Sequence, residues 1–247
     1  MIGLSHVRAF CASAAALPSA DALKDLLAEM TRRMGFAYFA LVHHVELTNA
    51  GHRINLVDYP ADWIECFEAR RLYACDPIHR ASQRTSVGFT WSDVGRLIDL
   101  TPADRSVLAD ARTAGLGEGF TIPAHLPGEL NGSCSFATRS GGEIDRDQLP
   151  FVQLIGGFAF EAARRLGRTG TVPMEFTRLT DRQAECVALV ARGKTDWEIS
   201  RILGIGQETV TQHVKDARER YGTTRRTLLA IRALFDGQIS FADVFGR

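Results

Sequence analysis

The stretch Leu179–Leu234 reads LTDRQAECVALVARGKTDWEISRILGIGQETVTQHVKDARERYGTTRRTLLAIRAL. It contains two helix-start signals, because Thr180 precedes Gln183, and Thr195 precedes Glu198, by the three-residue spacing of a capping box. After each start, apolar residues recur at intervals of three and four, and a Gly-Ile-Gly connection separates the second segment from a polar third one. The pattern predicts a helix-turn-helix within four helices, whose third helix can enter the major groove of DNA.

The composition suits a globular protein with a large core. The chain has 247 residues, of which 45% are hydrophobic, and its formal net charge is zero, so two domains are expected and overall charge demands no polyanionic partner. Basic residues nevertheless gather locally, at Lys215, Arg218, Arg220, Arg225, Arg226 and Arg232. A solvated helix surface has the same pattern, but beside a helix-turn-helix we favour contact with DNA phosphates.

Cysteine and histidine spacing argues against disulfides and metals. The five cysteines are odd in number and contain no C-x-x-C pair, which favours reduced thiols. The seven histidines show no metal-ligand spacing, and no apolar run approaches the roughly 20 residues of a membrane helix. The alanine-rich N-terminus weakly resembles a signal peptide, but an amphipathic helix is the better interpretation. We expect a cytoplasmic protein without cofactor, metal or membrane contact.

The first two thirds of the chain predict a mixed domain. Apolar spacing predicts helices in residues 1–16, 19–34, 63–72, 101–114 and 147–166, while β-prone runs predict strands in residues 36–45, 52–59, 86–91 and 134–138. Residues 115–123 are glycine-rich and receive no assignment. We expect an α+β fold: an α/β/α sandwich with a mainly antiparallel sheet in residues 1–167, a Gly- and Pro-containing linker in 168–176, and the helix-turn-helix domain in 177–247.

Two sets of motifs resemble a known family. The C-terminal stretch contains LT-x-R-Q-x-E at Leu179–Glu185, GKT at Gly193–Thr195, EIS at Glu198–Ser200 and TV-x-x-H at Thr209–His213. The N-terminal half contains Tyr59, Trp63, Phe67, Asp76-Pro77, Trp91, the run AGLGEGFTIP at Ala114–Pro123, and GEL at Gly128–Leu130 followed by Ser135. Over nearly the whole chain, these motifs resemble the LuxR family of quorum-sensing regulators. The resemblance implies an acyl-homoserine-lactone-binding domain followed by a DNA-binding domain.

The resemblance also implies a ligand site. It places nine residues around the ligand: Tyr59, Trp63, Phe67, Asp76, Ile78, Trp91, Leu116, Thr121 and Ser135. Asp76 would accept the ligand's amide N–H in a charge-assisted hydrogen bond, and Trp63 would donate to the lactone carbonyl. The hydroxyls of Tyr59 and Ser135 would donate to the carbonyl beside the amide, and Trp91 would pack on the lactone ring. Without the resemblance, a helix cap is the lesser alternative for Asp76, whereas a core stripe is the favoured interpretation of Tyr59, Trp63 and Phe67.

Two departures from the family pattern bear on the ligand. Phe67 stands where a second tyrosine is frequent, and Ile78 replaces a threonine or serine found in several members. Both changes make the pocket less polar. We therefore expect an acyl chain without strong dependence on a 3-oxo group, or a branched or aryl acyl group.

The resemblance assigns the DNA-binding residues in two groups. Thr211, Gln212 and Lys215 would reach base edges, since glutamine suits adenine and lysine suits guanine. Phosphate contacts would come from Lys194, Thr195, Gln207, Thr209 and Arg218. The segment Thr227–Phe235 is more apolar than a solvated helix requires, which favours a homodimer contact.

The expected function is therefore a ligand-responsive transcription regulator that binds a pseudopalindromic operator as a dimer. One alternative keeps the DNA-binding output but responds to a non-lactone signal, or to none. Another is an interaction protein that titrates partners through its dimer surface. An enzyme would need a set such as Asp76 with His79, or Ser133 with His125, and neither has a recognisable orienting group or oxyanion device. We expect no enzymatic activity.

Overall fold

The computed structural model describes residues 2–44, 54–126, 129–168 and 178–246. The chain divides into two compact units, here called the N-terminal domain (residues 1–125 and 130–171) and the C-terminal domain (containing residues 172–247). The expected linker and the start of the second expected strand fall almost entirely outside the described residues. Each domain is described by itself below.

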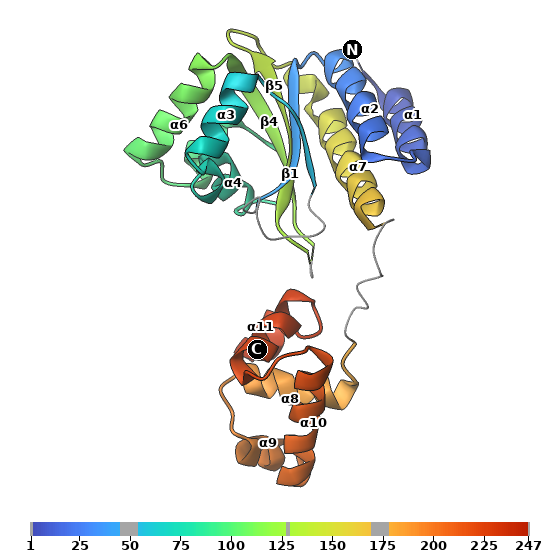
Figure 1. Ribbon diagram of the computed structural model, residues 1–247, viewed down its shortest axis with the longest axis vertical. Coiled ribbons are helices and arrows are strands. Elements are labelled where there is room, and N and C mark those ends of the chain that lie inside the picture. The colour runs from blue at the N-terminus through green and yellow to red at the C-terminus, as the bar shows by residue number, and fades with distance from the viewer. Residues whose placement is uncertain (1, 45–53, 127–128, 169–177, 247) are drawn as a thin grey trace. The chain divides into compact units, whose positions relative to one another are not determined.

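A five-stranded antiparallel sheet forms the centre of the N-terminal domain (Figure 1). Its strands are β1 (Tyr38–His43), β2 (Asn55–Asp58), β3 (Phe89–Thr90), β4 (Leu116–Ala124) and β5 (Gly132–Arg139), in the order β2-β1-β5-β4-β3. The central pairing joins β1 to β5, with Leu41 opposite Cys134. Because every neighbouring pair is antiparallel, the expected sheet type is confirmed.

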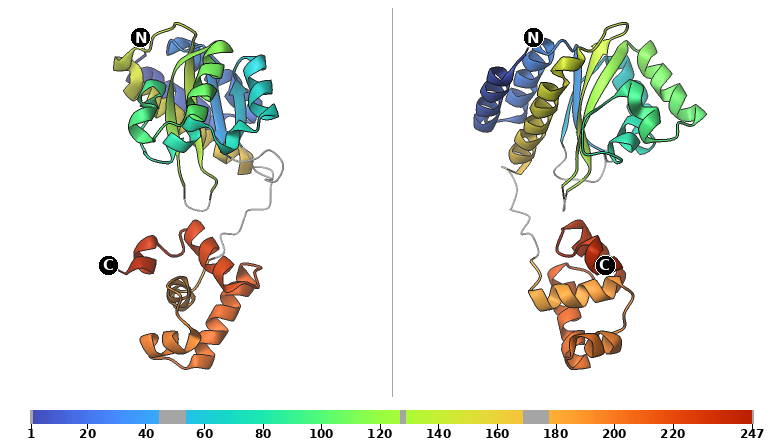
Figure 2. Two further views of the ribbon diagram at one scale, coloured as in Figure 1. Left: turned by 90° about the vertical axis from the view of Figure 1, so that its left-hand side faces the viewer. Right: turned by 180° about the vertical axis from the view of Figure 1, so that it is seen from behind.

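Helices cover both faces of this sheet, as the two views of Figure 2 show. One face carries α1 (Leu4–Ala16), α2 (Ala20–Arg33) and α7 (Leu149–Arg168). The other face carries α3 (Ala61–Ala69), α4 (Pro77–Ser82), α5 (Val94–Leu97) and α6 (Pro102–Thr113). Two short 3-10 turns, η1 (Leu72–Ala74) and η2 (Trp91–Asp93), connect elements on this face. A third 3-10 turn, η3 (Arg146–Gln148), leads into α7. The expected α/β/α sandwich is therefore confirmed.

The alternation of strand side chains gives the two faces different roles. On β1, Phe39 and Leu41 are fully buried in the core shared with α1, α2 and α7, whereas Ala40 and Val42 face a cavity on the opposite side. Strand β5 repeats this pattern, because Phe136 belongs to the same core and Ser135 faces the cavity. Successive side chains of a strand point to opposite faces, so one strand sequence builds both a core and a cavity wall.

Some expected elements differ from the structure. Residues 116–124 form the long strand β4, which its glycines had concealed, since glycine is depleted in strands. Gly117 and Gly119 are needed there, because a Cβ at these positions would meet the Arg139 backbone and the Trp91 ring. Helix α3 ends at Ala69 rather than at residue 72, and Arg71 follows in the left-handed region with φ 52°.

The C-terminal domain consists of helices. They are α8 (Asp181–Ala191), α9 (Asp196–Leu203), α10 (Gln207–Arg220), α11 (Arg226–Phe235) and the short α12 (Phe241–Phe245). Both capping boxes are present, and Gly204 ends α9 in the left-handed conformation with φ 66°. Helix α12 was not expected, and Ile202 is 54% exposed although its spacing suggested packing.

A small apolar core joins the helices of the C-terminal domain. It contains Val187 and Cys186 of α8, Ile199 of α9, Val210 of α10 and Leu229 of α11, all fully buried. The five cysteines are free thiols, as their spacing predicted. Within the described ranges, no helix has the length and apolar character needed to cross a membrane.

Candidate ligand pocket and nucleic-acid interface

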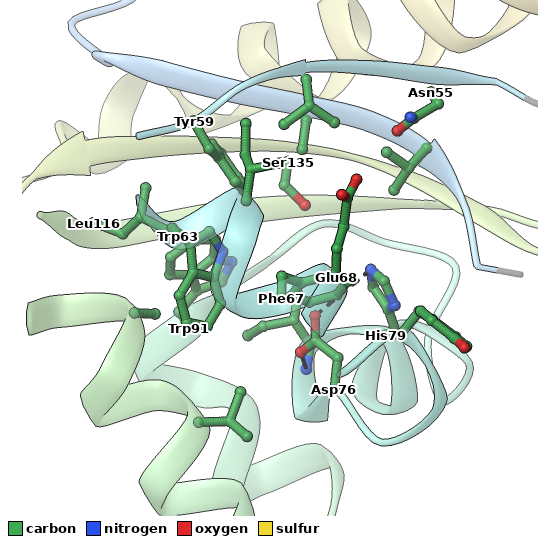
Figure 3. Close-up of a pocket in the computed structure, with 18 of the residues that line it drawn as sticks. Asn55, Tyr59, Trp63, Phe67, Glu68, Asp76, His79, Trp91, Leu116 and Ser135 are labelled. Atoms are coloured by element: carbon green, nitrogen blue, oxygen red, sulfur yellow. Dashed lines mark hydrogen bonds and ion pairs between the residues drawn. The ribbon is translucent and has the colours of Figure 1, made fainter. Parts of the chain in front are cut away.

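The cavity of the N-terminal domain lies between the sheet and the helices α3, α4 and α6. Eight of the nine residues predicted around the ligand line it: Tyr59, Trp63, Phe67, Asp76, Ile78, Trp91, Leu116 and Ser135. They come from segments far apart in the sequence, and Figure 3 shows their side chains pointing into one space. Its remaining walls are mostly apolar and come from β1, β2 and α6. Such a cavity suits a largely apolar ligand with a few polar groups.

Helix α3 places the aromatic residues of the cavity. Tyr59 precedes the helix, and Trp63 and Phe67 follow one turn apart, with ring centroids separated by 5.9 Å. Trp63 is buried, and among the described residues its indole N–H has no hydrogen-bond acceptor. An indole N–H in this position is available to a carbonyl oxygen of a ligand.

Asp76 is both a helix cap and a cavity residue. Its Oδ1 accepts a hydrogen bond of 2.8 Å from the backbone N–H of Ile78, which starts α4. Its Oδ2 lies 3.6 Å from Nε2 of His79. The two interpretations of Asp76 are therefore compatible, because one oxygen caps the helix while the other remains for a donor in the cavity.

A chain of hydrogen bonds supports the cavity wall beside Trp91. The Trp91 indole N–H donates to Oγ1 of Thr121 over 2.9 Å, and Thr121 Oγ1 is 2.8 Å from Oγ of Ser135. Thr121 is fully buried and does not line the cavity, so it lies behind the predicted ligand contacts. Its hydroxyl fixes Trp91 and Ser135 in place, and a residue in this position orients ligand contacts without touching the ligand.

Tyr59 keeps its proton. Burial raises the pKa of its hydroxyl, and the nearby charge of Asp76 raises it further, while a hydrogen bond with Ser135 acts in the opposite direction. The net pKa lies well above that of a free tyrosine. Tyr59 is therefore a hydrogen-bond donor at every physiological pH.

The structure adds cavity residues that sequence reasoning missed. Asn55 of β2, Glu68 of α3 and His79 of α4 line the end away from Trp63 and Trp91 (Figure 3). Tyr73 of η1 also lines the cavity. No local motif marks them. Only the pairing of β2 with β1, and the packing of α3 and α4 against the sheet, bring them to one place.

The histidines next to the cavity form a packed group. The rings of His44 and His79 stack at 3.9 Å, and His44 Nε2 shares a hydrogen bond of 2.8 Å with Oγ of Ser133. Burial lowers the pKa of His44 to about 2, with further lowering from His79, His125 and His43. His125 itself bonds to the carbonyl of Ser82, so Ser133 and His125 do not form the pair that an enzyme would need.

A close contact between Gly119 and Trp91 gives a first prediction. A Cβ at position 119 would lie 2.3 Å from a carbon of the Trp91 ring. Gly119→Ala is expected to destabilise the N-terminal domain by about 1–3 kcal/mol and to shift Trp91 out of the cavity wall. Urea unfolding followed by tryptophan fluorescence measures both effects.

Gly157→Ala is the matched control for this substitution. Gly157 lies in α7, and no atom is within 4 Å of the added Cβ. Alanine there should leave stability unchanged or raise it by up to about 1 kcal/mol, because glycine is unfavourable inside a helix. Equal unfolding midpoints for Gly119→Ala and the parent protein would contradict the expected clash.

Helix α10 presents a polar face to solvent. Gln207, Thr209, Thr211, Gln212 and Lys215 are exposed on it, as predicted for a helix that reads DNA. The opposite face packs inward through Val210, Val214 and Ala217. The amphipathic spacing of the sequence therefore predicted correctly that α10 has one packed face and one face exposed to solvent.

Three other predicted DNA contacts also have roles in the domain. Lys194 lies 3.4 Å from Glu198, and Thr195 caps α9. Arg218 is half-buried and donates to the carbonyl of Thr224 over 3.0 Å. Arg218 therefore orders the connection after α10.

A network that was not predicted joins α9, α10 and α11. Asp196, at the start of α9, accepts hydrogen bonds from the guanidinium of Arg226 and, over 2.8 Å, from the hydroxyl of Thr211. Arg226 also donates to the carbonyl of Lys194 over 2.6 Å. Burial alone would raise the pKa of Asp196, but the hydrogen bonds from Arg226 and Thr211 hold it below its usual value. The network fixes α10 relative to its neighbours.

Comparison with known families decides what the two domains are. The family described as "Autoinducer binding domain" matches residues 19–163, and the family described as "Bacterial regulatory proteins, luxR family" matches residues 177–233. The chain belongs to the LuxR family of transcriptional regulators. The first match contains every cavity residue described above, and the second contains the helix-turn-helix and most of α11.

Curated LuxR-family proteins are similar over most of the chain. The HTH-type quorum sensing-dependent transcriptional regulator RpaR of Rhodopseudomonas palustris is 34% identical over 185 residues, which are 73% of this chain and 73% of RpaR. The transcriptional activator protein AhyR of Aeromonas hydrophila is 29% identical over 213 residues, covering 83% of this chain and 81% of AhyR. This LuxR-family protein is thus a DNA-binding regulator with an autoinducer-binding domain.

A solved structure has the same fold. Escherichia coli SdiA aligns with a TM-score of 0.68 at 24% identity, covering 94% of this chain and 97% of SdiA. SdiA in complex with octanoyl-rac-glycerol aligns with a TM-score of 0.69 at 23% identity, covering 97% of this chain and 99% of that one. The fold of this LuxR-family chain is therefore shared with an experimental structure.

Proposed function

We propose that the protein binds a neutral acyl- or aryl-homoserine lactone in the N-terminal cavity and, as a homodimer, a pseudopalindromic DNA operator. The proposed boundaries are residues 1–167 for the signal-binding domain, 168–176 for the linker and 177–247 for the DNA-binding domain. RpaR, whose name describes it as quorum sensing-dependent, supports a diffusible signal.

One observation carries the lactone proposal. Four polar side chains of complementary kinds line one cavity that is otherwise mostly apolar: Tyr59, Trp63, Asp76 and Ser135. Asp76 accepts the amide N–H, the hydroxyls of Tyr59 and Ser135 donate to the acyl carbonyl, and Trp63 donates to the lactone carbonyl. Trp91 closes the site over the ring, held by Thr121. Each polar group of such a ligand then has a partner, which burial requires.

The second candidate is a signal without a lactone or an amide. SdiA was solved with octanoyl-rac-glycerol, an ester with two hydroxyls, and its fold is the one found here. Such a ligand has no amide N–H, but a hydroxyl is also a donor for Asp76. The two candidates differ at Trp63, because an acylglycerol lacks the lactone carbonyl to which the Trp63 indole N–H would donate. The melting experiment below therefore includes octanoylglycerol.

An enzymatic function is not proposed. Ser133 is 1% exposed, and its hydroxyl bonds to His44 rather than to a group in the cavity. The pair formed by Asp76 and His79 lies beside the ligand space without a nucleophile between them. A regulator needs only binding here, and the proposed contacts provide it.

Dimer formation is supported by the surface of α11. Leu228, Ile231 and Phe235 are exposed at 36%, 57% and 46%, and they recur at helical spacing on one side of the helix. An apolar stripe of this kind is costly in water and suits a helix–helix contact between two copies. Two paired copies of α10 then read two half-sites of one operator.

Melting of the full-length protein tests the proposal. A lactone at a hundred times its dissociation constant stabilises the folded form by about 2.7 kcal/mol, which raises the melting temperature by about 5 to 10 °C. We expect this shift with unsubstituted or aryl-homoserine lactones, and less than a tenfold preference for 3-oxo forms, because Phe67 and Ile78 offer no polar group. The ligand-saturated protein should also retard duplexes selected from a random library.

The results separate the candidates. A shift with octanoylglycerol but with no lactone favours the second candidate. No shift with either class contradicts signal binding in this cavity. A preference of tenfold or more for 3-oxo ligands contradicts the argument from Phe67 and Ile78 while leaving lactone binding intact.

A further inference from the structure

The cavity has a second polar end that the proposed lactone contacts leave unused. Trp63, Trp91 and Leu116 gather at one end in Figure 3, whereas Glu68, Asn55 and His79 are drawn at the other. The side chains between them are mainly apolar. A ligand whose head group binds near Trp63 therefore extends its tail toward Glu68.

Glu68 is a cavity carboxylate for which the described residues provide no partner. It lines the cavity from the last turn of α3, directly after Phe67, and its residue is exposed at the open end. Within the described part of the chain, no ion pair or side-chain hydrogen bond involves it. By contrast, Arg70, which directly follows α3, is paired with Asp110 at 2.6 Å.

Among the described residues, the neighbours of Glu68 offer it few hydrogen-bond donors. His79 faces Asp76 at 3.6 Å and stacks on His44 at 3.9 Å, while Phe67 contributes an aromatic edge 6.0 Å from the His79 ring. Asn55, across the opening on β2, carries the amide that could donate, and its side chain is exposed. An ionised carboxylate accepts hydrogen bonds and donates none.

These observations determine which tail fits. A tail ending in a methyl group leaves the carboxylate only to water, whereas a hydroxyl donates to it in a charge-assisted hydrogen bond. A tail ending in a carboxylate is repelled, because like charges at short range disfavour binding. We infer that Glu68 selects signals whose acyl or aryl tail ends in a hydrogen-bond donor such as a hydroxyl, and excludes tails that end in an acid. This inference rests on the proposed function.

Affinity measurements with matched tails test the inference. The full-length protein is titrated with hexanoyl, octanoyl and decanoyl homoserine lactones whose terminal carbon is a methyl, an alcohol or a carboxylic acid. At the chain length that reaches Glu68, we expect the alcohol to bind about fivefold more tightly than the methyl, a modest gain because Glu68 is exposed to water. The acid should bind at least tenfold more weakly than the methyl.

Two substitutions at one position separate charge from hydrogen bonding. Glu68→Gln keeps an acceptor but removes the charge, so it should retain the preference for the alcohol and lose the rejection of the acid. Glu68→Leu removes both, so the methyl-ended ligand should bind at least as tightly as the alcohol. Glu65→Gln is the matched control, because Glu65 is exposed on the same helix and does not line the cavity.

The outcomes distinguish this inference from the proposal on which it rests. If the methyl-ended lactones bind but the alcohol gains nothing at any length, or if Glu68→Leu keeps the preference, the inference is overturned and lactone binding stands. If no lactone of any kind binds, both are overturned. Selection that Glu65→Gln also abolishes would overturn the assignment to Glu68.

Discussion

Asp76→Asn is expected to weaken binding of the signal by about 10- to 100-fold while changing the stability of the unliganded protein by less than about 1 kcal/mol. In the proposed function the carboxylate accepts a charge-assisted hydrogen bond from the ligand amide, and the substitution removes its charge. The helix cap survives, because asparagine is as good an N-cap as aspartate and can still accept from the N–H of Ile78. Ligand titration gives the first quantity and thermal unfolding gives the second.

A similar aspartate provides the control for this substitution. Asp145 caps a short helical turn by accepting from the N–H of Asp147 over 3.1 Å, in an exposed place away from the cavity. Asp145→Asn should leave ligand affinity within about twofold. Full affinity in Asp76→Asn would show that Asp76 serves only as a cap. A large loss of stability in both variants would instead show that each cap contributes more than expected to the free energy of unfolding.

Arg226→Ala is expected to destabilise the C-terminal domain by about 1–3 kcal/mol and to weaken DNA binding. The substitution leaves Asp196 without its guanidinium partner and leaves the carbonyl of Lys194 without its donor. Arg226 and Asp196 are 36% and 21% exposed, so water reduces the cost below that of a fully buried pair. Thr211 is held by the same Asp196, so the face of α10 that we propose reads bases loses a support.

Hydrogen exchange measured by mass spectrometry on the full-length protein localises this effect. Amides of α9 and α10 should lose about tenfold or more of their protection, while the N-terminal domain is unchanged. Arg182→Ala is the matched control, because Arg182 pairs with Glu185 at 2.7 Å with both side chains exposed. An exposed pair contributes about 0–1 kcal/mol, so this control should behave like the parent protein. Equal exchange in the two variants would contradict the role of the network.

The same network has a defined pH dependence. The folded-state pKa of Asp196 lies below its unfolded value, so the unfolded chain binds the proton more readily. The resulting stabilisation is fully present above about pH 4, where the unfolded residue is ionised, and is lost as the pH falls through the folded pKa. Below about pH 4, the exchange difference between Arg226→Ala and the parent protein should therefore shrink.

Local sequence predicted the C-terminal domain well because its signals are short-range. Capping boxes at Thr180 and Thr195 involve residues three apart, and the glycine that ends α9 acts through its own backbone. Helices are built from such local contacts, so their starts are readable without tertiary structure. The exposure of Ile202 was missed because spacing alone does not say which apolar residues find a neighbour.

The N-terminal domain was less predictable where distant segments meet. Strand β4 was missed because it contains glycines, which are rare in strands. These glycines are required because the Trp91 ring and the Arg139 backbone, from other parts of the chain, pack too close to β4 for a Cβ. The position of Thr121 behind the cavity wall also follows from the pairing of β4 with β5, in which Thr121 lies opposite Ser135. Propensity within a strand does not contain this information.

The sequence by itself determined that the chain has a helix-turn-helix and which face of its third helix is solvated. It also predicted nine residues around a signal, of which eight line a single cavity. Only the tertiary structure decided that Thr121 supports the wall, that Asp196 and Arg226 hold α10, and that Glu68 lines the same cavity. The physical reason is the sequence separation of the interacting residues. Helix caps and amphipathic faces depend on neighbours in sequence, whereas a cavity and a three-helix network depend on side chains that folding brings together.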